Sequence, residues 1–132
     1  MSARGNLVLT DRASTPVEHT FTPDGDDTNG IHLYSEKSTV PLGNPKFTIG
    51  LRQTTGKYKP SIKLQVPVVQ NQTINGVSNP VIVRTSYAEI QFSFDGLSTA
   101  QERADVVGML ASSLEAAQTQ INDLIVNLSD IY

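Results

Sequence analysis

The chain has 132 residues and a mass of 14.3 kDa, a length that suits a single domain spanning residues 1–132 with a modest core. Charged residues make up 17% of the sequence, against roughly 25% in typical soluble domains, and a subunit that covers much of its surface with copies of itself tolerates this composition. The absence of cysteine excludes disulfides, thiolate nucleophiles and sulfur-ligated metals. No signal-peptide pattern or membrane-length apolar run occurs, so we expect a soluble chain, cytoplasmic where it is made, without a membrane partner.

The charges are distributed unevenly along the chain. The formal net charge is −3, yet the segment from Lys37 to Ala88 contains seven basic residues and no Asp or Glu. The flanking segments contain the other three basic residues and all thirteen acidic ones, so the middle carries +7 and the flanks 3 − 13 = −10. Such asymmetry predicts that the middle of the chain faces a polyanion.

The chain begins with strand patterns. Residues 6–12 alternate Leu7 and Leu9 with polar neighbours, and residues 18–22 form a short, weaker partner, which predicts an N-terminal hairpin over residues 6–22. An acidic, turn-rich break then follows Pro23. After it we expect an antiparallel sheet over residues 31–94.

Three central segments carry the clearest pattern. Residues 46–53, 59–67 and 86–94 each alternate apolar and polar side chains with a period of two, which places the two kinds on opposite faces of a strand. If the three pair as antiparallel strands, one sheet face is apolar and the other is polar. The predicted polar set is Thr48, Arg52, Lys59, Ser61, Lys63, Gln65, Tyr87 and Glu89.

This polar set has the chemistry of a surface for single-stranded RNA. Cations neutralise phosphates, an aromatic ring stacks on a splayed base, and short polar groups bind base edges. The alternative is an ordinary solvated sheet face. The absence of acidic residues from position 37 to position 88 favours the RNA interpretation.

Residues 68–83 connect the second and third of these segments. Asn75-Gly76 is typical of a type I′ hairpin turn, and Asn79-Pro80 indicates a stiff segment. The sequence is compatible with a flexible contact loop over residues 68–83 and with an ordinary long hairpin.

The period changes in the last third of the chain. Asp95-Gly96 ends the strands, and two capping boxes follow, Ser98 with Gln101 or Thr99 with Glu102. Apolar residues then recur at helical spacing over 104–114 and over 121–128. These patterns predict two amphipathic helices within residues 98–128, and strands followed by helices indicate an α+β fold.

The expected areas of sheet and helix predict a homodimer. A helix is about 10 Å across and strands lie about 4.8 Å apart, so two helices cover roughly the width of four strands. The sequence predicts six or seven strands, including the N-terminal hairpin. If all of them are apolar on one side, part of that face stays uncovered in one copy; the alternative is that the hairpin folds away from the main sheet. We expect a second copy and its helices to cover the remainder.

Over nearly its full length, the chain resembles the coat proteins of single-stranded RNA bacteriophages, the levivirus family. The resemblance rests on the order and spacing of several segments together: NLVLTDR, KFTIGLRQTT, SIKLQVPVVQNQTINGVSNPV, RTSYAEIQFSF, STAQERADVVGML and INDLIVNLSDIY. It implies an N-terminal β-hairpin, a five-stranded antiparallel sheet and two C-terminal helices that interlock with those of a second copy.

The resemblance also implies a function. Dimers of the family build an icosahedral T=3 capsid, and the loop that corresponds to residues 68–83 changes conformation at its symmetry axes. The inner sheet face binds a hairpin of the genomic RNA at the start of the replicase gene, which represses translation and marks the genome for packaging. The expected location is the virion, with assembly in the cytoplasm of the bacterial host.

Matched position by position, the resemblance implies three kinds of RNA contact. The adenine pocket corresponds to Ile31, Thr48, Ser61 and Lys63. The phosphate contacts correspond to Arg52, Lys57 and Lys59, and the stacking tyrosine corresponds to Tyr87. Gly50 stands where some relatives have a hydroxyl-bearing residue, and Glu89 stands where some have Asn, so the preferred RNA hairpin is not implied.

Other function classes have weaker support. The main alternative is a non-viral structural or adaptor subunit that self-assembles without nucleic acid. An enzyme is disfavoured because His19 and His32, which we interpret as strand residues at solvated edges, have no HxH, HExxH or GxSxG motif beside them. The acidic segment DGDDTNG lacks the bidentate Glu that ends an EF-hand loop. We therefore predict no catalytic residue, metal, cofactor or small-molecule substrate.

Overall fold

The computed structural model describes residues 3–38 and 40–132 of the chain. It divides into two compact units, Met1–Ser93 and Phe94–Tyr132. No helix among the described residues is long and apolar enough to cross a membrane. The first unit is a curled antiparallel sheet and the second is mainly helical, which agrees with the predicted α+β class.

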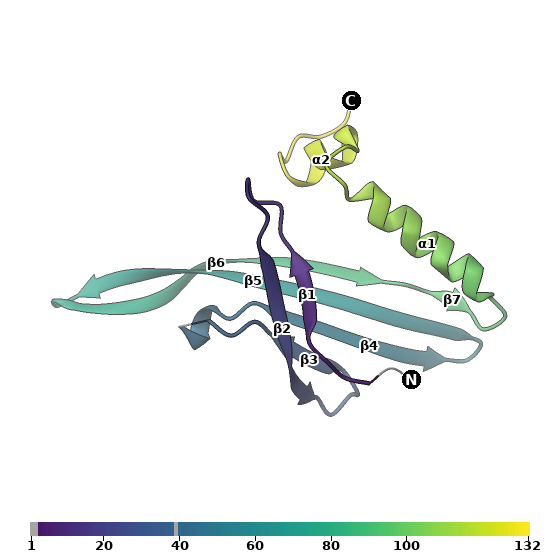
Figure 1. The fold of residues 1–132 in the computed structure, drawn as a ribbon, viewed down its shortest axis with the longest axis horizontal. Helices are drawn as coiled ribbons and strands as arrows, with labels where there is room; N and C mark the ends of the chain where they lie inside the picture. The colour runs from purple at the N-terminus through teal and green to yellow at the C-terminus, as the bar shows by residue number, and fades with distance from the viewer. Residues whose placement is uncertain (1–2, 39) are drawn as a thin grey trace. The chain divides into compact units, whose positions relative to one another are not determined.

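The strands of the first unit follow one another in chain order across the sheet (Figure 1). They are β1 (Leu7–Thr10), β2 (Glu18–Asp26), β3 (His32–Ser35), β4 (Lys46–Thr54), β5 (Lys57–Ile74) and β6 (Val77–Gln91), with the short 3-10 helix η1 (Pro41–Gly43) between β3 and β4. Every neighbouring pair from β1 to β6 is antiparallel. This up-and-down order needs only short connections between consecutive strands.

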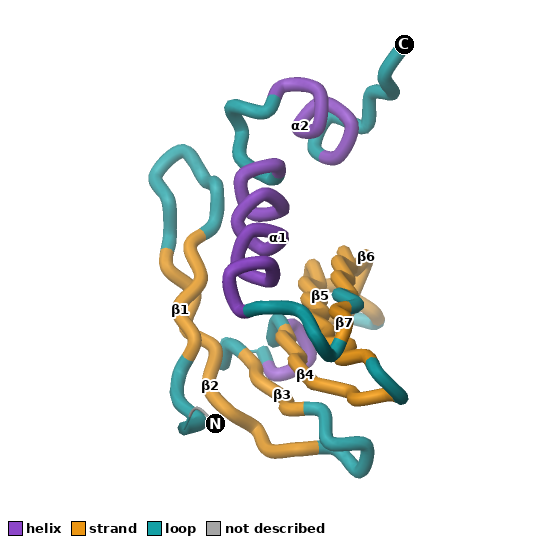
Figure 2. The backbone as a smooth tube through the Cα atoms, turned by 90° about the vertical axis from the view of Figure 1, so that its right-hand side faces the viewer, coloured by secondary structure: helices purple, strands orange, loops and turns teal. Residues whose placement is uncertain are grey.

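The N-terminal hairpin continues into the sheet. The first unit therefore has one row of six strands, β1 to β6, where the sequence predicts a hairpin and a separate five-stranded sheet. Strand β2 runs past Thr22 to Asp26 and pairs with both β1 and β3. The break expected after Pro23 is a register shift between Pro23 and Gly25, and Gly25 has a φ of 123° that favours glycine. A β-bulge thus lets the strand continue through a proline and an acidic turn sequence. Figure 2 shows β2 running from the β1 hairpin into the sheet.

Residues 68–83 lie in the long hairpin of β5 and β6, not in an irregular loop. The strands pair up to Ile74 and Val77, so the connection is only Asn75 and Gly76. Their φ angles of 53° and 78° are both positive, as a type I′ turn requires. The turn predicted from the sequence is therefore confirmed, and the pairing contains one irregularity, between Val68 and Val69.

The core of the first unit is small. Among the described residues, the only buried apolar side chains are Phe21 and Tyr34, and Ser35 is the one buried polar side chain. The ring of Phe21 lies 6.0 Å from that of Phe47, at an angle of 53°. Strands β1 and β2 cross the apolar face of the sheet (Figure 1), and this crossing buries the Phe21 ring.

The second unit consists of β7 (Phe94–Asp95), α1 (Ala100–Ser113) and α2 (Thr119–Ile125). The two predicted helices are confirmed, and of the two candidate capping boxes the structure contains that of Thr99. The backbone N–H of Glu102 donates to Thr99 Oγ1 at 3.2 Å, and the N–H of Thr99 donates to the Glu102 carboxylate at 3.1 Å. Neither helix contains a buried residue, so this unit has no core of its own in a single chain.

Candidate nucleic-acid interface

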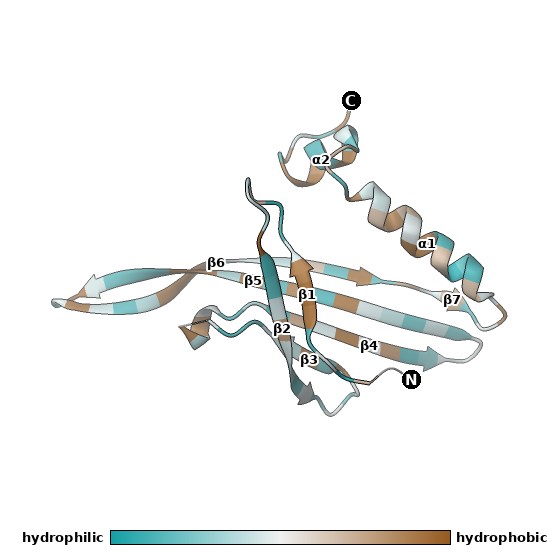
Figure 3. Ribbon diagram, in the orientation of Figure 1, coloured by the Kyte–Doolittle hydropathy of each residue, from teal (hydrophilic) through white to brown (hydrophobic). Residues whose placement is uncertain are grey.

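Strand pairing gathers the predicted RNA-contacting residues on one face of the sheet. Residues directly opposite each other in antiparallel strands point to the same side, and Thr48 is opposite Lys63, which is opposite Glu89. Residues two positions apart on each strand share this side. We call this surface the polar face, and it consists of Lys46, Thr48, Gly50, Arg52, Lys57, Lys59, Ser61, Lys63, Gln65, Tyr87, Glu89 and Gln91. The alternation of hydropathy along β4, β5 and β6 is visible in Figure 3.

The polar face is strongly cationic. It carries five basic side chains, from Lys46, Arg52, Lys57, Lys59 and Lys63, against the single carboxylate of Glu89, a net charge of +4. The Lys63 ammonium lies 4.0 Å from the Glu89 carboxylate, and both side chains are more than half exposed. An exposed ion pair at this distance is weak, so it leaves the Lys63 ammonium able to bind an anion.

An aromatic ring and short polar groups accompany these cations. The Tyr87 side chain is 71% exposed beside Gln65, so its ring is available for stacking. Ser61 lies opposite Gly50, and a Cβ atom on Gly50 would clash with Ile31 Cδ1. The missing side chain at Gly50 therefore makes room for Ile31 at the edge of the polar face, close to Ser61 and Thr48.

The structure thus brings together the ten residues predicted for the RNA surface: Ile31, Thr48, Arg52, Lys57, Lys59, Ser61, Lys63, Gln65, Tyr87 and Glu89. The prediction omitted Lys46 and Gln91, although Lys46 continues the alternation of β4 and lies opposite Gln65. Two basic residues of the central segment lie elsewhere. Arg84 is opposite Val68 on the other face, and the Lys37 ammonium contacts Asp24 at 2.6 Å.

The acidic residues at the end of β2 and directly after it face separate partners. Asp24 binds Lys37, Asp26 binds Arg4 and His32, and Asp27 accepts hydrogen bonds from the backbone N–H groups of Asn29 and Ile31. Among the described residues, no group of three or more His, Asp or Glu side chains is arranged to hold a metal ion.

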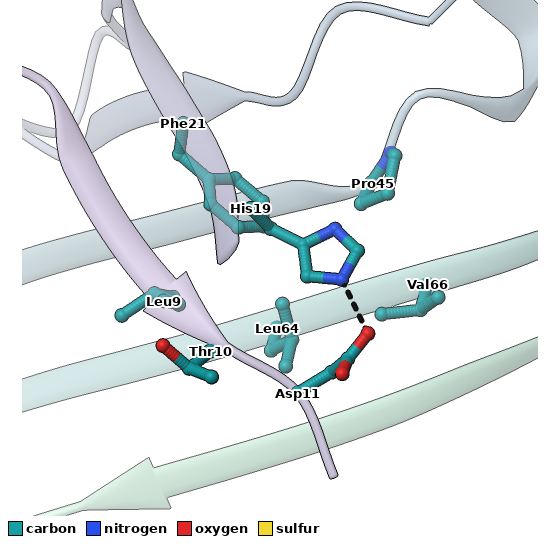
Figure 4. A pocket seen from close by; sticks show the side chains of 8 residues that line it. All are labelled: Leu9, Thr10, Asp11, His19, Phe21, Pro45, Leu64 and Val66. Carbon is teal, nitrogen blue, oxygen red and sulfur yellow. Dashed lines mark hydrogen bonds and ion pairs between the residues drawn. The ribbon is translucent and has the colours of Figure 1, made fainter. Parts of the chain in front are cut away.

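The opposite face of the sheet is apolar and bears a cavity under the N-terminal hairpin (Figure 4). The cavity has a volume of about 330 Å³ and is lined by Leu9, Thr10, Asp11, His19, Phe21, Pro45, Leu64 and Val66. Further along this face, Leu51 is 66% exposed. An apolar surface left open in this way favours association with another protein surface.

His19 lies at this cavity between two carboxylates. Its Nε2 is 2.7 Å from Asp11 Oδ2 and its Nδ1 is 2.8 Å from Glu36 Oε2. These hydrogen bonds, first to Asp11 and then to Glu36, raise the pKa of His19 above its ordinary 6.5. The bond from His19, followed by those from the backbone N–H groups of Val17 and Ala13, lowers the pKa of Asp11 to about 2. When His19 is protonated, both ring N–H groups donate to these carboxylates, so the imidazolium connects the β1–β2 hairpin with the residue that follows β3.

The chain is similar to known coat proteins in both sequence and fold. The pattern of the family described as Levivirus coat protein matches residues 2–132. The capsid protein of Pseudomonas phage PRR1 is 48% identical over 96% of this chain and 97% of its own length, and that of Qbeta virus (strain MX1) is 35% identical over 80% of this chain and 78% of its own length. The capsid protein of bacteriophage GA has a similar structure, with a TM-score of 0.80, 25% identity and 97% coverage of each chain. The virus-like particle protein of bacteriophage ESE058 shares the fold, with a TM-score of 0.86 over 99% of this chain and 100% of its own, at 22% identity.

Proposed function

The chain belongs to the levivirus coat protein family, and from this premise we propose that it assembles into an icosahedral T=3 shell that encloses single-stranded RNA bound on the polar face. A coat protein of this kind is a structural component of the virion, and its family is not an enzyme family. Assembly takes place in the cytoplasm of the bacterial host.

The observation that carries the RNA-binding proposal is the strand register. It places five cations, the exposed Tyr87 ring and several short polar groups on one surface. The cations bind the phosphate chain, the ring stacks on an unpaired base, and the small groups around Thr48 and Ser61 bind base edges. These contacts suit a hairpin loop, whose bases are unstacked. We infer that such a hairpin at the start of the replicase gene is bound, which represses translation and selects the genome for packaging.

Self-association is supported by the apolar surface that a single chain leaves open. The sheet carries the exposed Leu51 and the cavity beside Leu64 and Val66. The helical unit has no buried residue and exposes Met109, Leu124 and Ile125 by 42% or more. We propose that both surfaces are covered in a homodimer, which is the building block of the shell.

The test of RNA binding is its dependence on salt. For the full-length protein and the RNA hairpin from the start of the replicase gene, we expect log K to fall linearly with log salt concentration. The slope should be about −0.7 to −0.9 for each phosphate neutralised, so several contacts from the polar face give a steep dependence. Binding that is absent, or that does not respond to salt, would favour a self-assembling shell protein without a specific RNA surface.

A further inference from the structure

Lys37 lies at the border of the polar face, and its side chain is 59% exposed, but its ammonium is paired within the protein at a much shorter distance than that of Lys63. The Lys37 ammonium is 2.6 Å from Asp24 Oδ1 and 2.6 Å from Ser35 Oγ. Ser35 is only 3% exposed, so its buried hydroxyl restricts the position of the Lys37 ammonium beside Asp24. Hydrogen bonds from Lys37 and then from the Ser35 hydroxyl lower the pKa of Asp24, to which the charge of Lys46 also contributes.

The bulge in β2 brings the Asp24 carboxylate to this position. Asp24 is the unpaired residue between Pro23 and Gly25, and bulges commonly redirect one side chain. Ser35 lies directly opposite Lys46 across β3 and β4, and Lys46 is opposite Gln65, whose other neighbour is Tyr87. Ser35, Lys46, Gln65 and Tyr87 thus form one row of opposite residues across the sheet. The ion pair of Asp24 and Lys37 lies at the Ser35 end of this row, and the Tyr87 ring lies at the other end.

We propose that Asp24 is an internal counter-anion that keeps Lys37 away from RNA phosphates and so limits the phosphate-binding cations to β4 and β5. This inference rests on the proposed RNA binding. A phosphate and the Asp24 carboxylate compete for the same ammonium group, and a cation that is already neutralised releases no counterion when RNA binds. Asp24 thereby reduces sequence-independent affinity, which favours discrimination of the specific hairpin by base contacts.

The same strand offers a matched control. Asp26 also carries one negative charge, but its carboxylate binds Arg4 at 2.5 Å and His32 at 2.6 Å. It lies opposite His32, and His32 lies opposite Ile49 of the apolar face. Asp24→Asn and Asp26→Asn therefore change the net charge equally, while only the first frees a cation beside the polar face.

The experiment measures binding of the full-length protein to unstructured polyuridine RNA over a range of potassium chloride concentrations. Asp24→Asn should bind several-fold more tightly at low salt, with a log–log slope steeper by about 0.7, the contribution of one more phosphate on a single strand. Asp26→Asn should keep the wild-type slope. In the double variant Asp24→Asn/Lys37→Gln, whose net charge equals that of the wild type, affinity and slope should return to wild-type values.

Two results would overturn the inference. Equal changes in Asp24→Asn and Asp26→Asn would show a general effect of net charge, and weaker binding by the double variant than by the wild type would show that Lys37 already contacts RNA. The double variant keeps the test decisive even if Asp24→Asn does not fold. Failure of the proposed function itself looks different, because the wild type would then show no salt-dependent RNA binding.

Discussion

Lys63 and Tyr87 occupy neighbouring rows of the polar face and have different roles in the proposed RNA contact. Lys63 supplies an exposed charge, which lies 4.0 Å from the Glu89 carboxylate. Tyr87 supplies a flat apolar ring for stacking, and its strand places the ring on the polar face. A charge contact and a stacking contact respond differently to salt, so the two residues can be distinguished by experiment.

Replacement of either residue should weaken hairpin binding without preventing assembly. We expect Lys63→Ala and Tyr87→Ala each to reduce the binding free energy by about 1–3 kcal/mol, the size of a lost charged contact or base stack. Only Lys63→Ala should also lower the salt slope. Filter binding over a salt series measures both quantities.

Arg84→Ala is the matched control for this pair. Arg84 is a basic residue on β6, the strand of Tyr87, but it lies opposite Val68 on the other sheet face. Its loss should leave hairpin affinity and salt slope unchanged. If Arg84→Ala weakened binding while Lys63→Ala and Tyr87→Ala did not, the polar face would not be the RNA surface.

At single positions, the sequence predicts the sheet face on which a side chain lies better than it predicts the residue with which that side chain forms an ion pair. Alternation with a period of two was sufficient to place Thr48 and Lys63 together, because strand geometry alone decides the side of each residue. The pairing of Lys37 with Asp24 depends on a bulge, and local patterns do not contain the position of a bulge. His19 was interpreted as a solvated strand residue, whereas tertiary pairing brings two carboxylates to its ring.

At the scale of elements, the N-terminal hairpin is attached partly by the charged His19. The pKa of His19 is raised in the folded chain, so the protonated form stabilises the fold fully below the ordinary pKa of 6.5, and this contribution is lost as pH rises through the higher folded value. Asp11 has the opposite dependence. Its lowered pKa stabilises the folded state above pH 3.8, and this stabilisation is lost as pH falls from 3.8 toward about 2.

His19→Gln should therefore remove a pH-dependent loss of stability. We expect the wild-type protein to become less stable as pH rises above 6.5, because a neutral imidazole donates to only one of Asp11 and Glu36 and leaves the other facing a lone pair. Urea unfolding at several pH values measures the effect. His32→Gln should retain the loss of stability that follows the rise in pH, and an unchanged pH profile in His19→Gln would contradict the role of His19.

Helix α1 begins at a capping box whose contribution can be measured. Thr99→Ala removes the acceptor for the Glu102 N–H, and we expect it to lower the free energy of unfolding by about 1 kcal/mol. Ser112→Ala, at an exposed position in the last turn of the same helix, should have little effect. Circular dichroism during urea unfolding follows the helical signal, and equal stability of the two variants would contradict the cap assignment.

The element types and most of their order were predictable, while several boundaries were not. Asn75-Gly76 identified the β5–β6 turn correctly because a type I′ turn demands residues that tolerate positive φ. The sequence of residues 68–83 did not decide between a loop and a strand pair, and its polar residues and Pro80 resemble those of loops. Pairing along the whole β5–β6 hairpin comes from cross-strand contacts that local propensity does not reveal.

The whole molecule presents an apolar surface that one chain does not cover. Only Phe21 and Tyr34 are buried apolar side chains among the described residues, although hydrophobic residues make up 38% of the sequence. Burial of apolar surface is the main stabilising contribution to a fold. We therefore expect the dimer, and not the single chain, to be the unit that folds cooperatively. That residues 1–132 form one domain remains a prediction.

Leu124→Asp should prevent dimer formation. Leu124 lies on α2 and is 42% exposed in the single chain, and burial of an unpaired carboxylate at a dimer interface costs several kcal/mol. Gln120→Asp adds the same charge to the same helix at a polar position and should leave the dimer intact. Analytical ultracentrifugation of disassembled protein would reveal the difference, and stable Leu124→Asp dimers would exclude α2 from the interface.

The most direct test is a cryo-electron microscopy reconstruction of the particles formed when the protein is expressed in bacteria. We expect closed icosahedral shells built from dimers, with Lys63 and Tyr87 on the inner surface and RNA density against the polar face. A soluble monomer, or a shell in which this face points outward with no RNA against it, would contradict the proposed function.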